Sequence, residues 1–148
     1  MIKLLVQFIL ATIIISLIGF GFWLAYEPCF KLSKDFKNLV KPPEKIFEQQ
    51  SCILGETRIK GYVNVCLHEK KLYLSHTSPL SYIIKPLLID ISAITKIELC
   101  IAPILDKSYK FYIGEPNITT LILSQELIEK LEEDYGETIL YNKLEKLS

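Results

Sequence analysis

A long uncharged run near the amino terminus is the strongest constraint on how this chain can fold. From Leu4 to Tyr26 the sequence LLVQFILATIIISLIGFGFWLAY contains no charged residue. A helix rises about 1.5 Å per residue, so this run extends for about 35 Å and can cross a hydrocarbon layer of about 30 Å. We therefore predict that residues 1–26 form a single membrane anchor, with Trp23 and Tyr26 in the headgroup layer at one end.

Two other interpretations of the run stay open at this point. A cleaved secretory signal requires small residues at its cleavage site, whereas aromatic side chains and the pair Glu27-Pro28 stand there. A helix buried in a soluble core requires other elements around it, because residues 9–18 are apolar on every face. The anchor is the interpretation that the sequence favours most.

The charges of the chain balance, since 17 Lys and Arg face 17 Asp and Glu. This balance argues against a nucleic-acid partner, which normally requires concentrated positive charge to neutralise phosphates. The distribution along the chain is uneven, and the residues that follow the run are rich in lysine: Lys31, Lys34, Lys37, Lys41 and Lys45. Because lysines close to a spanning helix tend to stay on the cytoplasmic side, we expect the rest of the chain to be cytoplasmic.

These lysines also suggest contact with anionic lipid headgroups, where each is worth about 1 kcal/mol near the surface. The residues that we assign to lipid contact are Lys31, Lys34, Lys37 and Lys41, with Arg58 and Lys60 as a weaker second patch. Residues 27–45 are accordingly predicted to be a basic juxtamembrane linker with a short amphipathic helix that ends near Val40. The acidic segment Glu126 to Asp134 should face away from the membrane.

The remaining residues, 46–148, have the sequence pattern of a β-rich domain. In GYVNVCLHEKKLYLSH two alternating runs flank a polar turn, which predicts a hairpin with one buried and one wet face. Five further strands are expected at Ile53 to Lys60, Pro86 to Asp90, Thr95 to Ile101, Tyr109 to Ile113 and Ile118 to Leu123. Ser124 then begins a helix that Gly136 ends. The predicted fold class is α+β: a transmembrane helix, then an antiparallel barrel or sandwich of about seven strands capped by a C-terminal helix.

This order of elements resembles that of pleckstrin-homology-like (PH-like) and GRAM-like domains. VNVCLHEKKLYLS followed by KPLLIDISAITKIEL is similar to the hairpin and next strands of these domains, although Asp90 stands where that pattern commonly has proline. The whole layout resembles that of small bacterial membrane proteins with one N-terminal span and such a domain. In PH-like domains the connection corresponding to residues 56–61 gathers phosphates, and here it offers only Arg58 and Lys60.

Cys66, His68 and His76 are the residues closest to a chemical motif. A zinc site requires about four ligands, usually as two close pairs, and Cys66-x-His68 is a single poor pair with no second pair beside it. We assign no catalytic, cofactor or metal residue. The sequence therefore predicts a membrane-tethered, non-enzymatic PH-like interaction module that contacts lipid headgroups or another membrane protein. The alternative is an enzyme, or an accessory subunit that contributes part of an active site.

Overall fold

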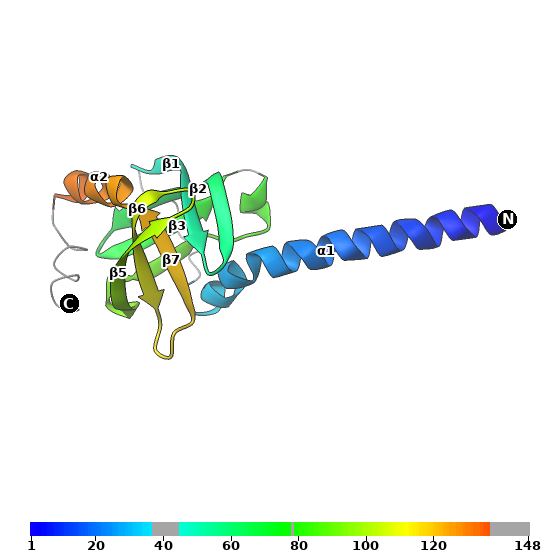
Figure 1. Ribbon diagram of the computed structural model, residues 1–148, viewed down its shortest axis with the longest axis horizontal. Helices are drawn as coiled ribbons and strands as arrows, with labels where there is room; N and C mark the ends of the chain where they lie inside the picture. Colours follow the sequence, from blue (N-terminus) through cyan, green and yellow to red (C-terminus); the bar gives the residue numbers. More distant parts are fainter. Residues whose placement is uncertain (37–44, 78, 137–148) are drawn as a thin grey trace.

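A long helix projects from one side of a β-rich domain (Figure 1). The structure is a computed structural model that describes residues 1–36, 45–77 and 79–136. Helix α1 spans Ile2–Phe36 and contains the whole uncharged run. By length and composition it is able to cross a membrane, and none of its most apolar 18-residue window is buried by the rest of the chain. The run is therefore not the core helix of this domain, and that interpretation is wrong.

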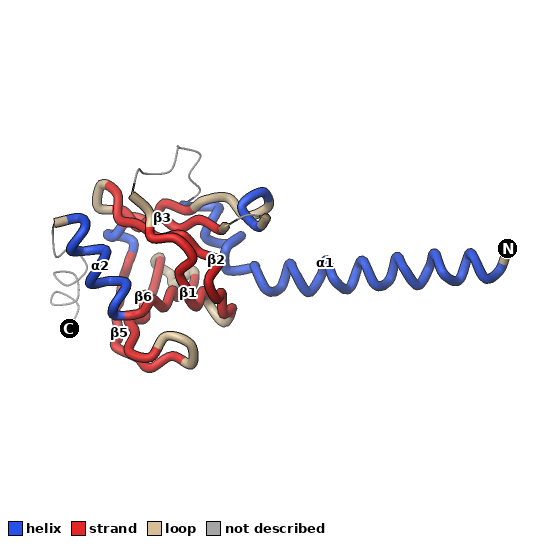
Figure 2. The backbone as a smooth tube through the Cα atoms, turned by 90° about the horizontal axis from the view of Figure 1, so that it is seen from above, coloured by secondary structure: helices blue, strands red, loops and turns tan. Residues whose placement is uncertain are grey.

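The domain is one curled antiparallel sheet that forms a half-barrel (Figures 1 and 2). Its seven strands lie in the order β4-β3-β2-β1-β7-β6-β5. They are β1 (Phe47–Leu54), β2 (Thr57–His68), β3 (Lys71–His76), β4 (Leu87–Asp90), β5 (Ile94–Ala102), β6 (Asp106–Ile113) and β7 (Thr119–Ser124). Two short 3-10 helices, η1 (Leu80–Tyr82) and η2 (Ile91–Ala93), flank β4, and helix α2 (Gln125–Tyr135) follows β7. The α+β prediction with about seven strands is confirmed.

The predicted hairpin is strands β2 and β3, which pair from Val63↔His76 to His68↔Lys71. Glu69 and Lys70 make its two-residue turn and have φ angles of 47° and 60°. Two consecutive positive φ values are the mark of a type I′ turn, whose twist matches that of the flanking strands. Polar residues at the tip thus close the hairpin even though neither is a glycine.

The expected single strand from Ile53 to Lys60 is wrong, because the chain reverses inside it. Strand β1 ends at Leu54 and β2 begins at Thr57. Gly55, with φ of +62°, provides the left-handed conformation that the tight turn requires. The first strand of the sheet is instead Phe47–Leu54. Its first half, FEQQ, is mostly polar and does not show the alternation that predicts a strand.

The prediction that one face of the hairpin is wet holds for Tyr62 and His68, which are exposed, but is wrong for the part of that face near Cys66. Cys66 and its cross-strand partner Tyr73 are 3% and 2% exposed, although they lie on the face expected to meet water. Helix α2 reaches this region, and its Tyr135 Oη accepts a hydrogen bond from the Lys70 backbone N–H at 3.2 Å. Strand periodicity reports the faces of a sheet but not the distant elements that cover them.

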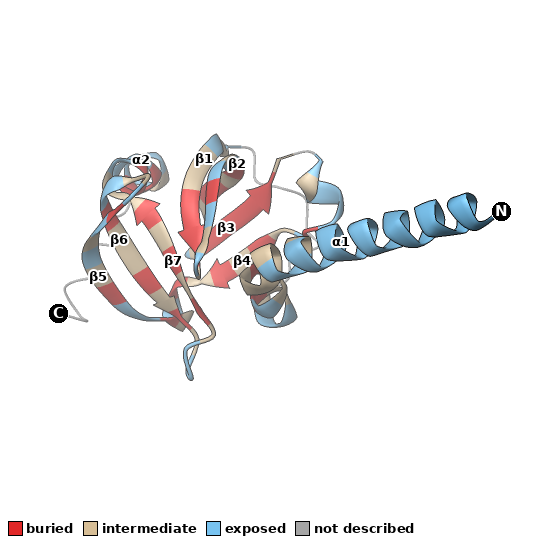
Figure 3. Ribbon diagram, turned by 45° about the vertical axis from the view of Figure 1, so that its right-hand side comes forward, coloured by how far each residue is buried: buried red, intermediate tan, exposed pale blue. Residues whose placement is uncertain are grey.

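Helix α2 has the expected start and end signals. Ser124 Oγ accepts a hydrogen bond from the Leu127 N–H at 3.2 Å, and Gly136 adopts φ of 77° at the C-cap. Leu127, Ile128 and Leu131 are buried in the core of the half-barrel, while the outer face of the helix is exposed (Figure 3). The predicted C-terminal capping helix is confirmed.

Asp90, the departure from the PH-like pattern, has a local structural role. Its carboxylate accepts a hydrogen bond from the Ser92 N–H at 2.9 Å and caps the start of η2. Since this bond favours the ionised form, it lowers the pKa of Asp90. The residue thus caps the short helical turn that connects β4 to β5.

The last turns of α1 belong to the core of the domain. Cys29 and Leu32 are 2% and 0% exposed and lie in the same apolar cluster as the inner residues of the sheet. Residues 27–36 are thus the uninterrupted end of α1, where the sequence suggested a separate linker helix. Its expected end near Val40 lies outside the described residues. Amphipathic spacing in this segment reflects packing on the sheet.

Replacement of Leu32 tests this packing. We expect Leu32→Ala to lower the free energy of unfolding by about 2–5 kcal/mol, because it leaves a cavity under the sheet. Lys34→Ala, two residues away on the exposed side, should change it by less than about 0.5 kcal/mol. The measurement is thermal unfolding of the full chain in detergent micelles. Equal effects of the two substitutions would show that α1 does not pack as described.

Candidate functional site

The candidate site is the junction where α1 enters the domain. Phe22 and Tyr26 pack against the core, with ring centroids 4.7 Å apart. The Tyr26 ring also meets His76 at the end of β3 edge-on, at 5.8 Å between centroids. Phe22 and Tyr26 both lie within the uncharged run. The domain therefore begins before the apolar segment has ended.

Pro28 and the β1–β2 turn fix the helix to the sheet. Proline within a helix has no N–H and disturbs the hydrogen bonds of the preceding turn. The neighbouring carbonyl of Ala25 accepts a hydrogen bond from Thr57 Oγ1. A Cβ built on Gly55 would lie 2.9 Å from Pro28 Cγ, so the turn and the proline ring are in close contact. The β1–β2 turn thus packs against α1 at Pro28, the position where the helix is most easily kinked.

The four juxtamembrane lysines predicted to contact lipid do not behave alike. Lys31 Nζ forms an i,i+4 ion pair with Glu27 at 3.1 Å, and both side chains remain substantially exposed. Lys34 is exposed in the last turns of α1. Lys37 and Lys41 lie outside the described residues. The negative charge of Glu27 thus offsets the positive charge that Lys31 would offer to a headgroup.

The second predicted patch lies on strand β2. Arg58 and Lys60 are both exposed and directly follow Thr57, whose hydroxyl binds the Ala25 carbonyl. They therefore lie beside the junction in space, although about 30 residues of sequence separate them from the run. The fold thus brings this patch to the end of the domain where α1 enters.

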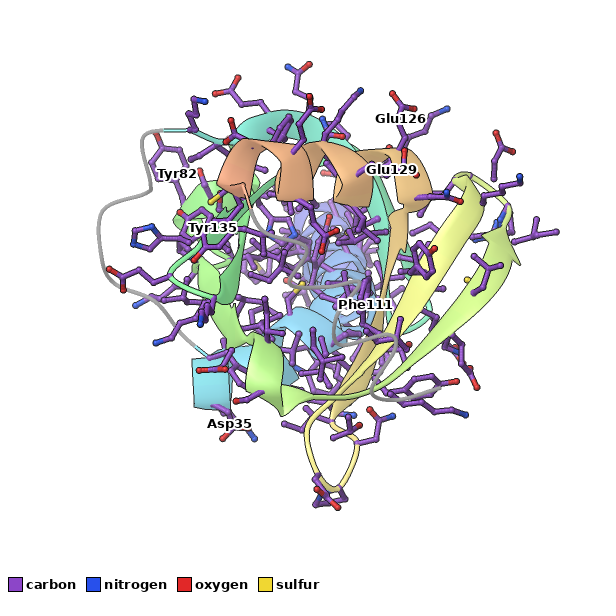
Figure 4. The ribbon with its side chains drawn as sticks, turned by 90° about the vertical axis from the view of Figure 1, so that its left-hand side faces the viewer. Asp35, Tyr82, Phe111, Glu126, Glu129 and Tyr135 are labelled. Atoms are coloured by element: carbon purple, nitrogen blue, oxygen red, sulfur yellow. The ribbon has the colours of Figure 1, made fainter. Side chains whose placement is uncertain are left out.

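Lys45 belongs to a different region. Its Nζ lies 2.6 Å from Asp134 Oδ1 of α2, at the end of the domain opposite the projecting part of α1 (Figure 1). Figure 4 views the domain from that opposite end, with α2 and its Glu126 and Glu129 in front. The acidic helix thus points away from the apolar run, which is the arrangement that the prediction requires.

A cysteine and a histidine meet at the junction, but not as an activated pair. Cys29 Sγ lies 3.9 Å from His76 Nε2. An activated cysteine requires a thiolate beside a positive group, whereas burial lowers the pKa of His76 to about 4 and keeps it neutral. The Cys29 side chain is 2% exposed, which leaves no path for a substrate. The contact is one of packing.

The residues singled out in the sequence are not brought together. Cys66 is buried, and burial raises the pKa of its thiol to about 11, while His68 lies on the surface. All four cysteines are free thiols, and burial raises the pKa of Cys52 to about 12. Within the described residues no group of three or more His, Cys, Asp or Glu side chains is arranged to hold a metal ion.

Two depressions in the described part of the surface lie away from the junction, near α2. One of about 430 Å³ is lined by the β5–β6 turn and the start of α2, including Asp106, Lys107 and Glu129. Another of about 370 Å³ lies between Lys45, Phe47 and Asp134. Both are open and lined by charges of both signs, and neither gathers the groups of a recognisable active site.

Comparison with known proteins gives no further assignment: no family model, no curated protein and no solved structure matches this chain. What the chain does must therefore be inferred from its own geometry. Sequence reasoning missed two features of the junction, namely the packing of His76 on Tyr26 and the turn at Gly55. The first has no sequence signal, whereas a glycine between two apolar runs is a turn signal for the second.

The pKa of His76 gives a prediction for stability. In the unfolded chain this histidine has its ordinary pKa of 6.5, and in the folded chain a pKa of about 4. Between these values the unfolded state binds the additional proton, so stability should fall as pH decreases from about 6.5 to 4, by roughly 2–3 kcal/mol, and be fully present above 6.5.

The comparison variant is His76→Gln, which has no titration in this window. Denaturant unfolding of the full chain in micelles, at half-unit pH steps, should give a flatter profile for the variant than for the wild type. Ionised carboxylates such as Asp90 and Glu126, whose pKa values are lowered by hydrogen bonds to Ser92 and Lys130, are common to both proteins. Identical slopes would contradict the burial of a neutral His76.

Proposed function

We propose that this protein is a single-pass, membrane-tethered interaction module without enzymatic activity. In this proposal α1 crosses the bilayer, and the PH-like domain is held at the cytoplasmic surface. There it contacts anionic lipid headgroups or another membrane protein. The observation that carries the proposal is the continuity of α1 from an unburied apolar run into the core of the domain.

The exposed surface of α1 supports the span. Its projecting part presents large apolar side chains in every direction, among them Phe8, Ile15, Leu17 and Ile18, each at least 65% exposed. A soluble domain rarely exposes apolar patches of more than a few hundred Å². Lipid hydrocarbon is a favourable environment for these apolar side chains. A helix is able to cross the hydrocarbon layer because its backbone hydrogen bonds are internal.

The rigid attachment supports a role in interaction. Since Leu32 and Cys29 are buried in the domain, the sheet keeps a fixed distance and orientation relative to the span. Tethering raises the effective concentration of the domain at the membrane, so even weak contacts become significant. Catalysis is not required for such a role.

The strand order and the capping helix support the PH-like interpretation. The order β4-β3-β2-β1-β7-β6-β5 consists of two antiparallel meanders, β1 to β4 and β5 to β7, that join through the pairing of β1 with β7. Helix α2 then caps the core, as it does in the domains that the sequence resembles. This layout also agrees with the small bacterial single-span proteins to which the sequence is similar.

The unique tryptophan of the chain, Trp23, tests the span. It lies on α1 and is 51% exposed. In bilayers of the full chain, we expect lipids brominated near the glycerol end of the acyl chain to quench its fluorescence more strongly than lipids brominated near the chain terminus. Aqueous iodide should quench it weakly. Strong iodide quenching without quenching by either brominated lipid would refute the span.

The side of the membrane is testable with two introduced thiols. Ile2→Cys and Lys107→Cys, at exposed positions at the two ends of the molecule, are made separately with Cys100→Ser, because the other cysteines are buried. An impermeant maleimide that reaches the outer face should label the Ile2→Cys variant in intact cells. It should label the Lys107→Cys variant only after permeabilisation. The reverse pattern would place the domain outside.

A further inference from the structure

We propose that residues 79–85, between β3 and β4, form a second membrane-contact element that places Tyr82 and Ile83 in the headgroup layer beside α1. This inference rests on the proposed span and adds a specific lipid-contact surface to it. None of these residues stood out in the sequence, and the partner is the bilayer in which α1 lies. We call residues 79–85 the η1 loop.

The η1 loop lies on the side of the domain from which α1 projects. In Figure 1 it is the green segment at the right of the domain, above α1, and Figures 2 and 3 show it beside the helix from two other directions. Helix α2 and strand β5 lie at the opposite side of the domain in Figure 1. The loop is thus among the parts of the domain that extend furthest toward the amino-terminal end of α1.

The depth of the junction places this side of the domain at the membrane surface. About 20 residues of helix cross the hydrocarbon layer, so a span that begins at Leu4 leaves it near Trp23. The domain already contacts Phe22, and the hydroxyl of Thr57 binds the carbonyl of Ala25. Parts of the domain that project toward the amino terminus beyond these contacts therefore meet the headgroups.

The residues just before the η1 loop contact the end of the uncharged run. His76 packs against Tyr26, and the next residue, Thr77, donates its N–H to the Tyr62 carbonyl at 2.9 Å. Tyr62 is itself 54% exposed. The chain thus enters the η1 loop from the level of Tyr26, the last residue of the uncharged run.

The loop holds its two exposed side chains outward. Ile84 is 2% exposed, Leu80 packs against the core, and the Ile84 N–H donates to the Leu80 carbonyl at 2.8 Å. Between these inward residues, Tyr82 is 85% and Ile83 58% exposed. The short helical turn therefore presents one aromatic and one branched aliphatic side chain on a structured base.

The exposed apolar side chains of the domain concentrate at this end. Outside α1, the large apolar residues that are exposed among the described parts of the chain are Tyr62, Tyr82, Ile83, Leu99 and Ile101. Three of the five belong to the α1 side, and the other two lie on edge strand β5. Tyrosine with one apolar and one polar end is favoured at the membrane interface.

Nearby charges agree with a lipid partner. Lys85 is exposed at the end of the loop, and Arg58 and Lys60 are exposed on β2, against Glu56 in the β1–β2 turn. A rim of positive charge around apolar side chains is the composition of surfaces that lie in an anionic headgroup layer.

The test moves the tryptophan reporter from α1 to the loop. Trp23→Phe is combined with Tyr82→Trp, and as matched control with Ile101→Trp, because Ile101 is 89% exposed on the far side. The full-length variants are placed in nanodiscs with neutral or anionic lipid. Headgroup-nitroxide lipids and lipids brominated near the glycerol should quench the Tyr82→Trp variant several-fold more than the control. Iodide should quench it several-fold less, and anionic lipid should enlarge both differences.

The outcomes separate this inference from the span. If the Tyr82→Trp variant is quenched like the control while native Trp23 is quenched by lipid, the span stands and the inference is overturned. If the variant is shielded from iodide without quenching by lipid, the loop faces protein and the inference is equally overturned. If native Trp23 is itself not quenched by lipid, the proposed span fails first.

Discussion

The burial of the end of α1 in the half-barrel is the interaction on which the rest of the structure depends. Curled sheets leave an open side, and their inner residues require cover from another element. Here Leu32 and Cys29 provide part of that cover, and α2 provides more through Leu127, Ile128 and Leu131. Helix α1 and the sheet therefore share one core, so the helix contributes to the folding of the domain.

This shared core changes what the anchor can do. A flexible linker would let the domain rotate freely above a membrane and present any face to it. With a continuous helix supported at Pro28 by Gly55 and Thr57, a spanning α1 would let only the faces near the junction approach lipid. Sequence distance is then a poor guide to membrane distance: Lys45 follows the basic stretch yet binds Asp134, whereas Arg58 lies beside the junction.

The sequence predicted those parts of the fold whose signals are local. The uncharged run, the β2–β3 hairpin and the Ser124 to Gly136 helix each have periodicity or caps that act within a few residues. The burial of Cys66 and Tyr73 and the packing of His76 on Tyr26 depend on elements far apart in the chain, which no local pattern encodes. For the same reason the lysines next to the run were visible as candidates, and the η1 loop was not.

The uncharged run and the domain overlap at Phe22 and Tyr26, and this overlap bears on where a boundary between lipid and water would lie along α1. Phe22 and Tyr26 lie in the run, and each has one side against protein and another toward the surroundings. A helix longer than the hydrocarbon layer accommodates the excess by tilting or by placing aromatic residues at the interface. Because the sheet is attached to these same residues, a tilt of α1 would tilt the domain with it. If α1 spans a bilayer as proposed, the last turn of the run is both the end of the span and the first contact of the fold, and it would couple the orientation of the domain to the thickness of the bilayer.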